Sequence, residues 1–253
     1  MIRKLLILFL FVCVVFFPVA VFASARESSV EISPSSLEMG TFFSGKAVKI
    51  SGRISSGRHV IIEIRGPEEK SIFNVKGRMG PFWMNRGKVE LEHAPFFYML
   101  LLPPGDDWTG RLPALGIGLE NLEKEVDIHS GTLDADTVFR RFVRLKRFEG
   151  LYGEMKDAIH YSHKEPGGKE FVAEFRFPSS TAPGEYRIVF HFVRNARVES
   201  RLDKKFDVEE VGFIRTVREV AYSRSLLYGF LCVVIALFVG TVMGLLFKGS
   251  GAH

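Results

Sequence analysis

Two histidines, His160 and His163, stand three residues apart and form the most suggestive pair for metal chemistry. On one turn of a helix their imidazoles could share an ion, but a closed metal site requires further ligands. No cysteine is nearby, and only Asp157 and Glu165 lie close along the chain. We therefore interpret this segment as a solvated polar loop before Pro166, and we expect neither a metal nor another cofactor.

Four arginines lie close together in a segment of helical periodicity: Arg140, Arg141, Arg144 and Arg147. Guanidinium groups match the geometry of phosphate and sulfate, so this face could contact a small anion or a lipid headgroup. An ordinary solvated helix face has the same composition. The sequence leaves both interpretations open.

Signatures of catalysis are missing from the sequence. It contains no nucleophile elbow, HExxH pair, phosphate-binding loop or glycine-rich dinucleotide fingerprint. The net charge is +5, but the basic residues are spread along the chain without a stripe of interleaved aromatics. We expect neither an enzyme nor a nucleic-acid-binding protein.

The first 25 residues have the pattern of a secretory signal peptide. Arg3 and Lys4 precede an apolar run, and Ala23 and Ala25 provide a small-x-small cleavage site. Cleavage after Ala23 and an uncleaved signal anchor are the alternatives. An export signal predicts that residues 26–225 form an extracytoplasmic domain.

A second apolar block predicts a transmembrane helix at residues 226–247. These residues carry no charge, and a helix of this length covers about 33 Å, enough to cross the hydrocarbon core of a bilayer. Gly240 and Gly244 form a GxxxG pair that would let another helix approach closely, although glycines are also common in membrane helices generally. Residues 248–253 would be a cytoplasmic tail. We therefore expect a single-pass protein of a bacterial inner membrane with most of its chain in the periplasm.

The positions of the two cysteines indicate that the domain between the apolar blocks is stabilised by packing rather than by a disulfide. Cys13 and Cys232 lie within the two apolar blocks at the ends of the chain. The part between them can therefore form no disulfide and no thiolate metal site.

Most of the predicted extracytoplasmic domain has the sequence pattern of short strands. Alternating apolar residues recur between turn residues, which favours a β-sandwich over a parallel sheet. The last three strands are expected at 170–177, 185–194 and 197–208. Tyr186 follows a Pro-Gly turn and is similar to the tyrosine corner of immunoglobulin-like sandwiches. We predict a mainly β, immunoglobulin-like sandwich.

A helical insertion around residues 106–165 interrupts the strand pattern. Residues 112–127 and 134–159 have helical character, and Asp134 or Thr132 could cap the second helix. This section would lie against one end of the sandwich, and two separate domains are the alternative.

Two aromatic patches lie beside predicted turns, at Phe82–Asn85 and Pro95–Tyr98. Exposed aromatics would mark an interface, whereas buried ones form core. Core is the favoured interpretation for both patches. Turns are expected at Gly77, at Gly80-Pro81 and at Arg86-Gly87.

Segments along nearly the whole chain resemble the putative transmembrane protein family that is described mainly from alphaproteobacteria. They are Val60–Pro67, Gly80–Asn85, Ala94–Tyr98, Arg144–Lys146 with Gly150–Tyr152, Ala182–Tyr186 and Leu226–Gly229. The resemblance implies an export signal, an extracytoplasmic domain and one C-terminal anchor. It also suggests a small-anion exporter as a neighbouring membrane protein, and it carries over no functional residue.

These observations together predict a membrane-anchored accessory or scaffold protein that interacts with the lipid bilayer and with another integral membrane protein. The alternative is a tethered periplasmic receptor for a small anion or another ligand, which would use the four arginines.

Overall fold

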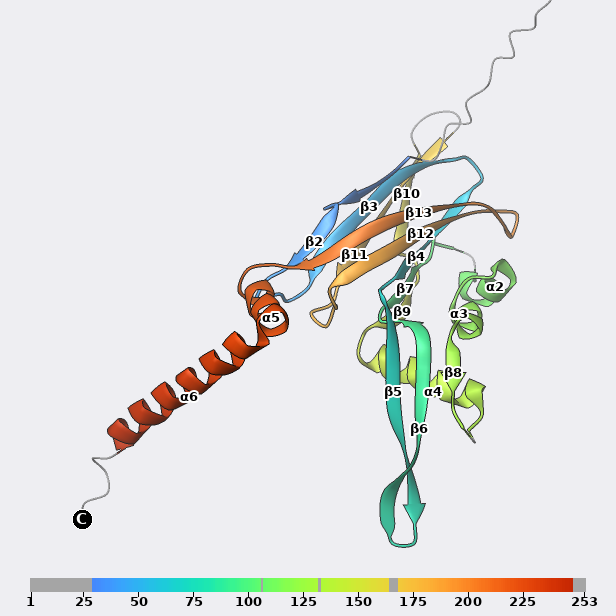
Figure 1. Cartoon of the computed structure of the whole chain (residues 1–253). Coiled ribbons are helices and arrows are strands. Elements are labelled where there is room, and N and C mark those ends of the chain that lie inside the picture. The colour runs from blue at the N-terminus through green and yellow to red at the C-terminus, as the bar shows by residue number, and fades with distance from the viewer. Residues whose placement is uncertain (1–28, 106, 132, 164–167, 248–253) are drawn as a thin grey trace, which may run out of the picture.

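The computed structural model describes residues 29–105, 107–131, 133–163 and 168–247 (Figure 1). The predicted signal peptide and cytoplasmic tail lie outside these residues. The described chain is mainly β, as predicted, with helices between its strands and one apolar helix at its C-terminal end.

The first sheet contains four antiparallel strands. Their order is β1 (Val30–Ser33), β3 (Lys46–Ser55), β11 (Gly168–Phe177) and β10 (Ile159–His163). Alternate residues of β11 are buried, from Phe171 to Phe177, while those between them are mostly exposed. This alternation gives the sheet one face toward the core.

The second sheet contains six strands, in the order β2 (Ser36–Met39), β13 (Arg197–Glu210), β12 (Gly184–Arg194), β4 (His59–Arg65), β7 (Tyr98–Leu101) and β9 (Tyr152–Met155). The pairs β2–β13 and β7–β9 are parallel, and the other pairs are antiparallel. The curled sheets in Figure 1 and these two parallel pairs differ from a purely antiparallel sandwich, so the immunoglobulin-like arrangement is not confirmed.

Aromatic rings fill the space inside the sheets. Phe177 stacks on Phe206 with ring centroids 5.5 Å apart, and it meets Tyr186 edge-on at 5.4 Å. The hydroxyl of Tyr186 donates a hydrogen bond to the carbonyl oxygen of Ala182 at 3.0 Å. A hydrogen bond from the tyrosine hydroxyl back to a nearby backbone carbonyl is the feature of a tyrosine corner, to which the sequence around Tyr186 is similar.

A long hairpin forms most of a third sheet. It consists of β5 (Glu68–Met79) and β6 (Phe82–Pro95), and the short β8 (Asp127–His129) joins its base. The predicted turns at Gly77 and Arg86-Gly87 are wrong, because both strands continue through them. The register shifts between Val75 and Lys76, so the glycines accompany a bulge within the ladder.

Three helices lie between the hairpin and the last strands. They are α2 (Trp108–Leu115), α3 (Leu119–Glu125) and α4 (Ala135–Phe148). Asp134 caps α4 by accepting a hydrogen bond from the backbone N–H of Thr137 at 2.9 Å, as predicted. The expectation of a helix to residue 159 is wrong, because α4 ends before Gly150, whose φ of 72° favours glycine, and strands β9 and β10 follow.

The hairpin leaves the same end of the second sheet as the C-terminal helices. On β12, Gly184 pairs with Val208 near the end of β13, and Arg187 pairs with Arg65 at the end of β4. Strand β13 then continues into the helices, while β4 continues into the hairpin. We call this the anchor-proximal end.

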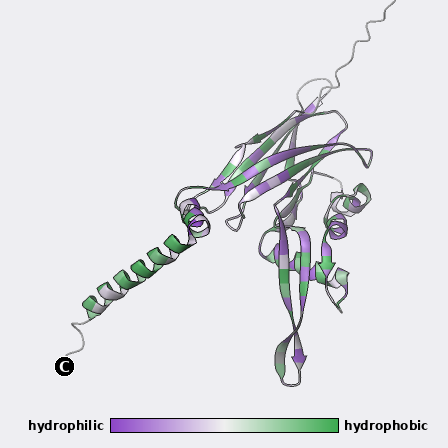
Figure 2. Cartoon of the chain, viewed as in Figure 1, coloured by the Kyte–Doolittle hydropathy of each residue, from purple (hydrophilic) through white to green (hydrophobic). Residues whose placement is uncertain are grey.

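Two helices complete the described chain: α5 (Phe213–Ser223) and α6 (Ser225–Phe247). An 18-residue stretch within the 23 residues of α6 has a mean hydropathy of 2.8, and no residue of the helix is buried. Figure 2 shows this helix as a continuous apolar segment, in contrast to the alternating strands. Its length and composition are those of a single membrane span, as predicted.

Candidate functional site

The tip of the hairpin is an exposed apolar and basic surface. Phe82 is 68% exposed and Met84 is 52% exposed, beside the turn at Gly80. The twelve residues of β5 extend the hairpin by about 40 Å, well away from the two larger sheets (Figure 1). The expectation that residues 82–85 form core is therefore wrong for Phe82 and Met84, because the hairpin carries them beyond the body of the protein.

The charged residues in the outer part of the hairpin are all positive. Residues 71–89 include the cations Lys76, Arg78, Arg86 and Lys88 and no aspartate or glutamate. Glu90 and Glu92, nearer the base, are paired with Lys70 at 2.8 and 2.6 Å. The outer part of the hairpin therefore carries net positive charge.

The second aromatic patch, in contrast, is core. Phe97 and Tyr98 are fully buried, and Phe97 contacts the rings of Phe175 and Phe177. Here the expectation of core is confirmed.

Helix α4 packs against the base of the hairpin. The ring of Phe142 meets that of Phe73 on β5 edge-on, with centroids 6.1 Å apart. Lys146 is almost fully buried, and its Nζ lies 2.5 Å from Glu69 and 4.7 Å from the ring centroid of Phe96. The buried ion pair and the aromatic contacts fix α4 on the hairpin.

The four arginines of α4 do not form one cluster of free charge. Arg140 pairs with Asp136 at 2.6 Å, and Arg147 lies 3.3 Å from Glu154. Arg141 and Arg144 are exposed and have no ion-pair partner among the described residues. The anion contact stays a prediction, and these two arginines are its available members.

A groove separates α4 from the inner face of the hairpin. It has a volume of about 280 Å³, and most of its lining is apolar. Val89 and Leu91 of β6 form its floor together with Phe73 and Val75, and Arg141 lies on its helical side. This groove could not be predicted from the sequence, since it depends on a hairpin that was expected to be several short strands.

The glycine pair of the membrane helix lies on an open surface. A Cβ atom added to Gly240 or to Gly244 would meet nothing within 4 Å. A helix–helix contact at this pair stays a prediction.

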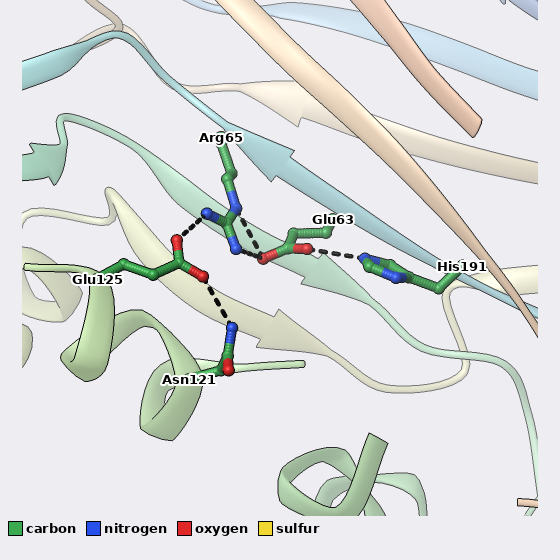
Figure 3. Close-up of polar contacts among 5 residues, drawn as sticks. All are labelled: Glu63, Arg65, Asn121, Glu125 and His191. Carbon is green, nitrogen blue, oxygen red and sulfur yellow. Dashed lines mark hydrogen bonds and ion pairs between the residues drawn. The ribbon is translucent and has the colours of Figure 1, made fainter. Parts of the chain in front are cut away.

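A buried charged cluster lies where β4, β12 and α3 meet (Figure 3). His191 Nε2 is 2.8 Å from Glu63 Oε2, and Arg65 Nη2 is 2.8 Å from Glu63 Oε1. Arg65 also binds Glu125 on α3, and the amide of Asn121 donates to the same carboxylate at 2.8 Å. The cluster thereby fastens α3 to the second sheet.

Glu63 is ionised in this setting. Burial by itself would raise its pKa, but the hydrogen bond from His191 and the charge of Arg65 outweigh burial and lower the pKa to about 2. An ionised carboxylate only accepts, so the Nε2 of His191 is the donor.

The position of this cluster points to a structural role. Glu63 and His191 are each only 2% exposed, and neither lines the groove beside α4. Glu63 and His191 have almost no access to solvent, so they can orient β4 and β12 but cannot meet a substrate, whereas Arg65 and Glu125 are partly exposed. One local sign of the cluster was missed: Glu63 lies inside the apolar run of β4, and Arg65 ends it.

The histidine pair lies on a strand rather than in the predicted loop. His160 and His163 belong to β10, which pairs with β11. In the described part of the chain, no three His, Cys, Asp or Glu side chains lie close enough together to hold a metal ion.

Comparison with known proteins adds a family but no activity. No curated protein matches the chain. A family described as "Putative transmembrane protein" matches residues 28–249, which include both larger sheets, the hairpin and the membrane helix. The chain therefore belongs to this family of putative transmembrane proteins.

Proposed function

We propose that this protein is a non-enzymatic, membrane-anchored accessory subunit that binds another integral membrane protein. The observation that carries the proposal is the exposed, apolar and basic tip of the hairpin. Apolar residues rimmed by charge are typical of protein interfaces. The hairpin starts at the anchor-proximal end, which favours a partner in the same membrane.

The strand order supports an immunoglobulin-like scaffold for this role. Strands β1, β3, β11 and β10 correspond in order to the A, B, E and D strands of such a sandwich, and β13, β12, β4 and β7 to G, F, C and C′. The tyrosine corner then falls on strand F, where such sandwiches place it. The hairpin would be an enlarged connection between C and C′, and loops at the ends of this fold commonly bind partners.

The proposed topology places the large domain in the periplasm of a bacterium, with α6 crossing the inner membrane once. The signal-like pattern of the first 25 residues and the order of signal and span support this orientation. Exposed aromatic residues near the span, Phe213 and Tyr222 among them, suit the interfacial region of a bilayer.

The partner is expected to present an acidic rim around an apolar patch, because the hairpin tip offers the complementary chemistry. A small-anion exporter is the class that the family resemblance suggests. Gly240 and Gly244 would provide a second contact, within the bilayer.

The test is affinity purification of the tagged full-length protein from gently solubilised native membranes. We expect one membrane protein to co-elute with the wild type and to be lost with a Phe82→Ser/Met84→Ser variant. Ile72→Ser is the matched control, because Ile72 is an exposed apolar residue nearer the base of the same hairpin. Equal recovery from wild type and tip variant would refute a role for the tip.

A Gly240→Leu/Gly244→Leu variant tests the second contact in the same experiment. Loss of the partner from this variant alone would assign the contact to α6. If no membrane protein co-elutes with the wild type, the accessory role is wrong.

A tethered receptor for a small anion is the second candidate, favoured by the unpaired charges of Arg141 and Arg144. A ligand of the folded state raises the unfolding temperature. Sulfite, sulfate, phosphate and an organosulfonate would be screened against the full chain. No change with any of them would exclude this function.

A further inference from the structure

The groove beside α4 has the build of a ligand site. Its floor is the inner face of the hairpin, where Phe73 lies opposite Val89 across the ladder. Val138 and Phe142 form its helical wall. Its volume of about 280 Å³ lies near the lower end of the range for small-molecule pockets, which begins at about 300 Å³.

The charged groups at the groove are all of one sign. Lys76 on β5 and Arg141 on α4 line it from opposite sides, and no carboxylate is among its lining residues. Neither cation has an ion-pair partner within the described ranges of the chain. Asp136 lies in the first turn of α4, but its carboxylate is bound to Arg140.

We propose that this groove binds the acyl chain of a single-chain anionic amphiphile of the fatty-acid class. The apolar floor would cover the chain, and Arg141 and Lys76 would bind the carboxylate. An inorganic anion would leave the floor uncovered, and an amphiphile with a neutral head would leave both cations without a partner. The proposal goes beyond the accessory role and does not depend on it.

The position of the groove suits an amphiphile that comes from a bilayer. The hairpin that forms its floor begins at the anchor-proximal end, the end that leads into α6. A single-chain amphiphile released from a lipid would thus be produced close to this site.

Photolabelling tests the proposal on the full chain in nanodiscs of phosphatidylcholine. The probe is dodecanoic acid with a photoreactive group at its methyl end, and labelled peptides are identified by mass spectrometry. We expect label on the peptides that contain Phe73, Val75, Val138 and Phe142. Unlabelled dodecanoate should compete for the site, whereas dodecanol and acetate should not.

Two arginines on the same helix provide a matched pair of variants. Arg141→Gln should lower labelling of the groove about tenfold, as expected for loss of one charged hydrogen bond. Arg144 is also exposed but does not line the groove, so Arg144→Gln should leave labelling within about twofold. Val75→Trp should fill the groove and abolish labelling, with urea unfolding to verify that each variant is folded.

Three results would overturn the proposal. The first is label confined to α6 and absent from the groove. The second is equal competition by dodecanol and dodecanoate. The third is the same loss of labelling in Arg144→Gln as in Arg141→Gln.

Discussion

Replacing Glu63 by glutamine should destabilise the fold in a way that depends on pH. The pKa of Glu63 is lowered from 4.5 to about 2, which at about 1.4 kcal/mol for each pKa unit corresponds to about 3 kcal/mol of folding stability. Solvent screening reduces this stabilisation only slightly, because the Glu63 side chain is 2% exposed. The neutral amide of Glu63→Gln keeps the shape but removes the charge that His191 and Arg65 bind.

The pH range follows from the direction of this shift. A carboxylate with a lowered pKa contributes its full stability above its unfolded pKa of 4.5 and loses it as the pH falls through about 2. The wild type should therefore exceed Glu63→Gln by about 3 kcal/mol at pH 7. The difference should shrink steadily below pH 4.5.

Urea unfolding of the full chain in nanodiscs measures this difference. Unfolding of the sheets would be followed by aromatic fluorescence between pH 7 and pH 3. Glu174→Gln is the matched control, because Glu174 is exposed on β11, and it should change stability by less than about 0.5 kcal/mol. A Glu63→Gln variant as stable as the control, or a difference that stays constant to pH 3, would refute the reasoning.

Three further substitutions test local features by the same urea measurement. Asp134→Ala removes the N-cap of α4 and should cost about 1 kcal/mol; no loss would mean that the cap is dispensable. Tyr186→Phe removes the bond to Ala182 and should also cost about 1 kcal/mol, and an unchanged midpoint would contradict this. Gly52→Ala should destabilise by about 1–3 kcal/mol, because the new Cβ would lie 2.5 Å from a backbone oxygen. Gly40→Ala, with open space around it, is its control and should be neutral.

The membrane helix and the last strands could be predicted because their signals are local. A run of 22 uncharged residues indicates a span without knowledge of the rest of the fold. The alternation in 170–177 likewise identifies β11, and a Pro-Gly turn precedes Tyr186. In each of these segments the residues that form the pattern also form the element.

The hairpin could not be predicted because a glycine between strand-like residues is compatible with a turn and also with a bulge inside a strand. Gly77 and Gly87 are typical of turns, but here they lie within paired strands beside a bulge. With turns at these glycines, the predicted structure had several short strands in place of one projecting hairpin. The wrong expectation that Phe82 forms core followed from that error, since a short strand would have kept it near the core.

The buried cluster was missed for a different reason. Glu63 and His191 are 128 residues apart, and only the pairing of β4 with β12 brings them together. Neither residue has a motif around it. A charged residue inside an apolar strand is the one local sign that such a partner exists.

The strand order also determines when the protein can become folded during its synthesis. Arg53 on β3 pairs with Glu170 on β11, 117 residues later, and β2 pairs with β13, the last strand before the anchor. Neither larger sheet can close while the C-terminal strands are unmade, whereas β5 and β6 are adjacent along the chain and can pair early. The early strands must therefore be kept from aggregating until the sequence just before α6 is available, so the protein becomes folded and anchored almost at the same moment.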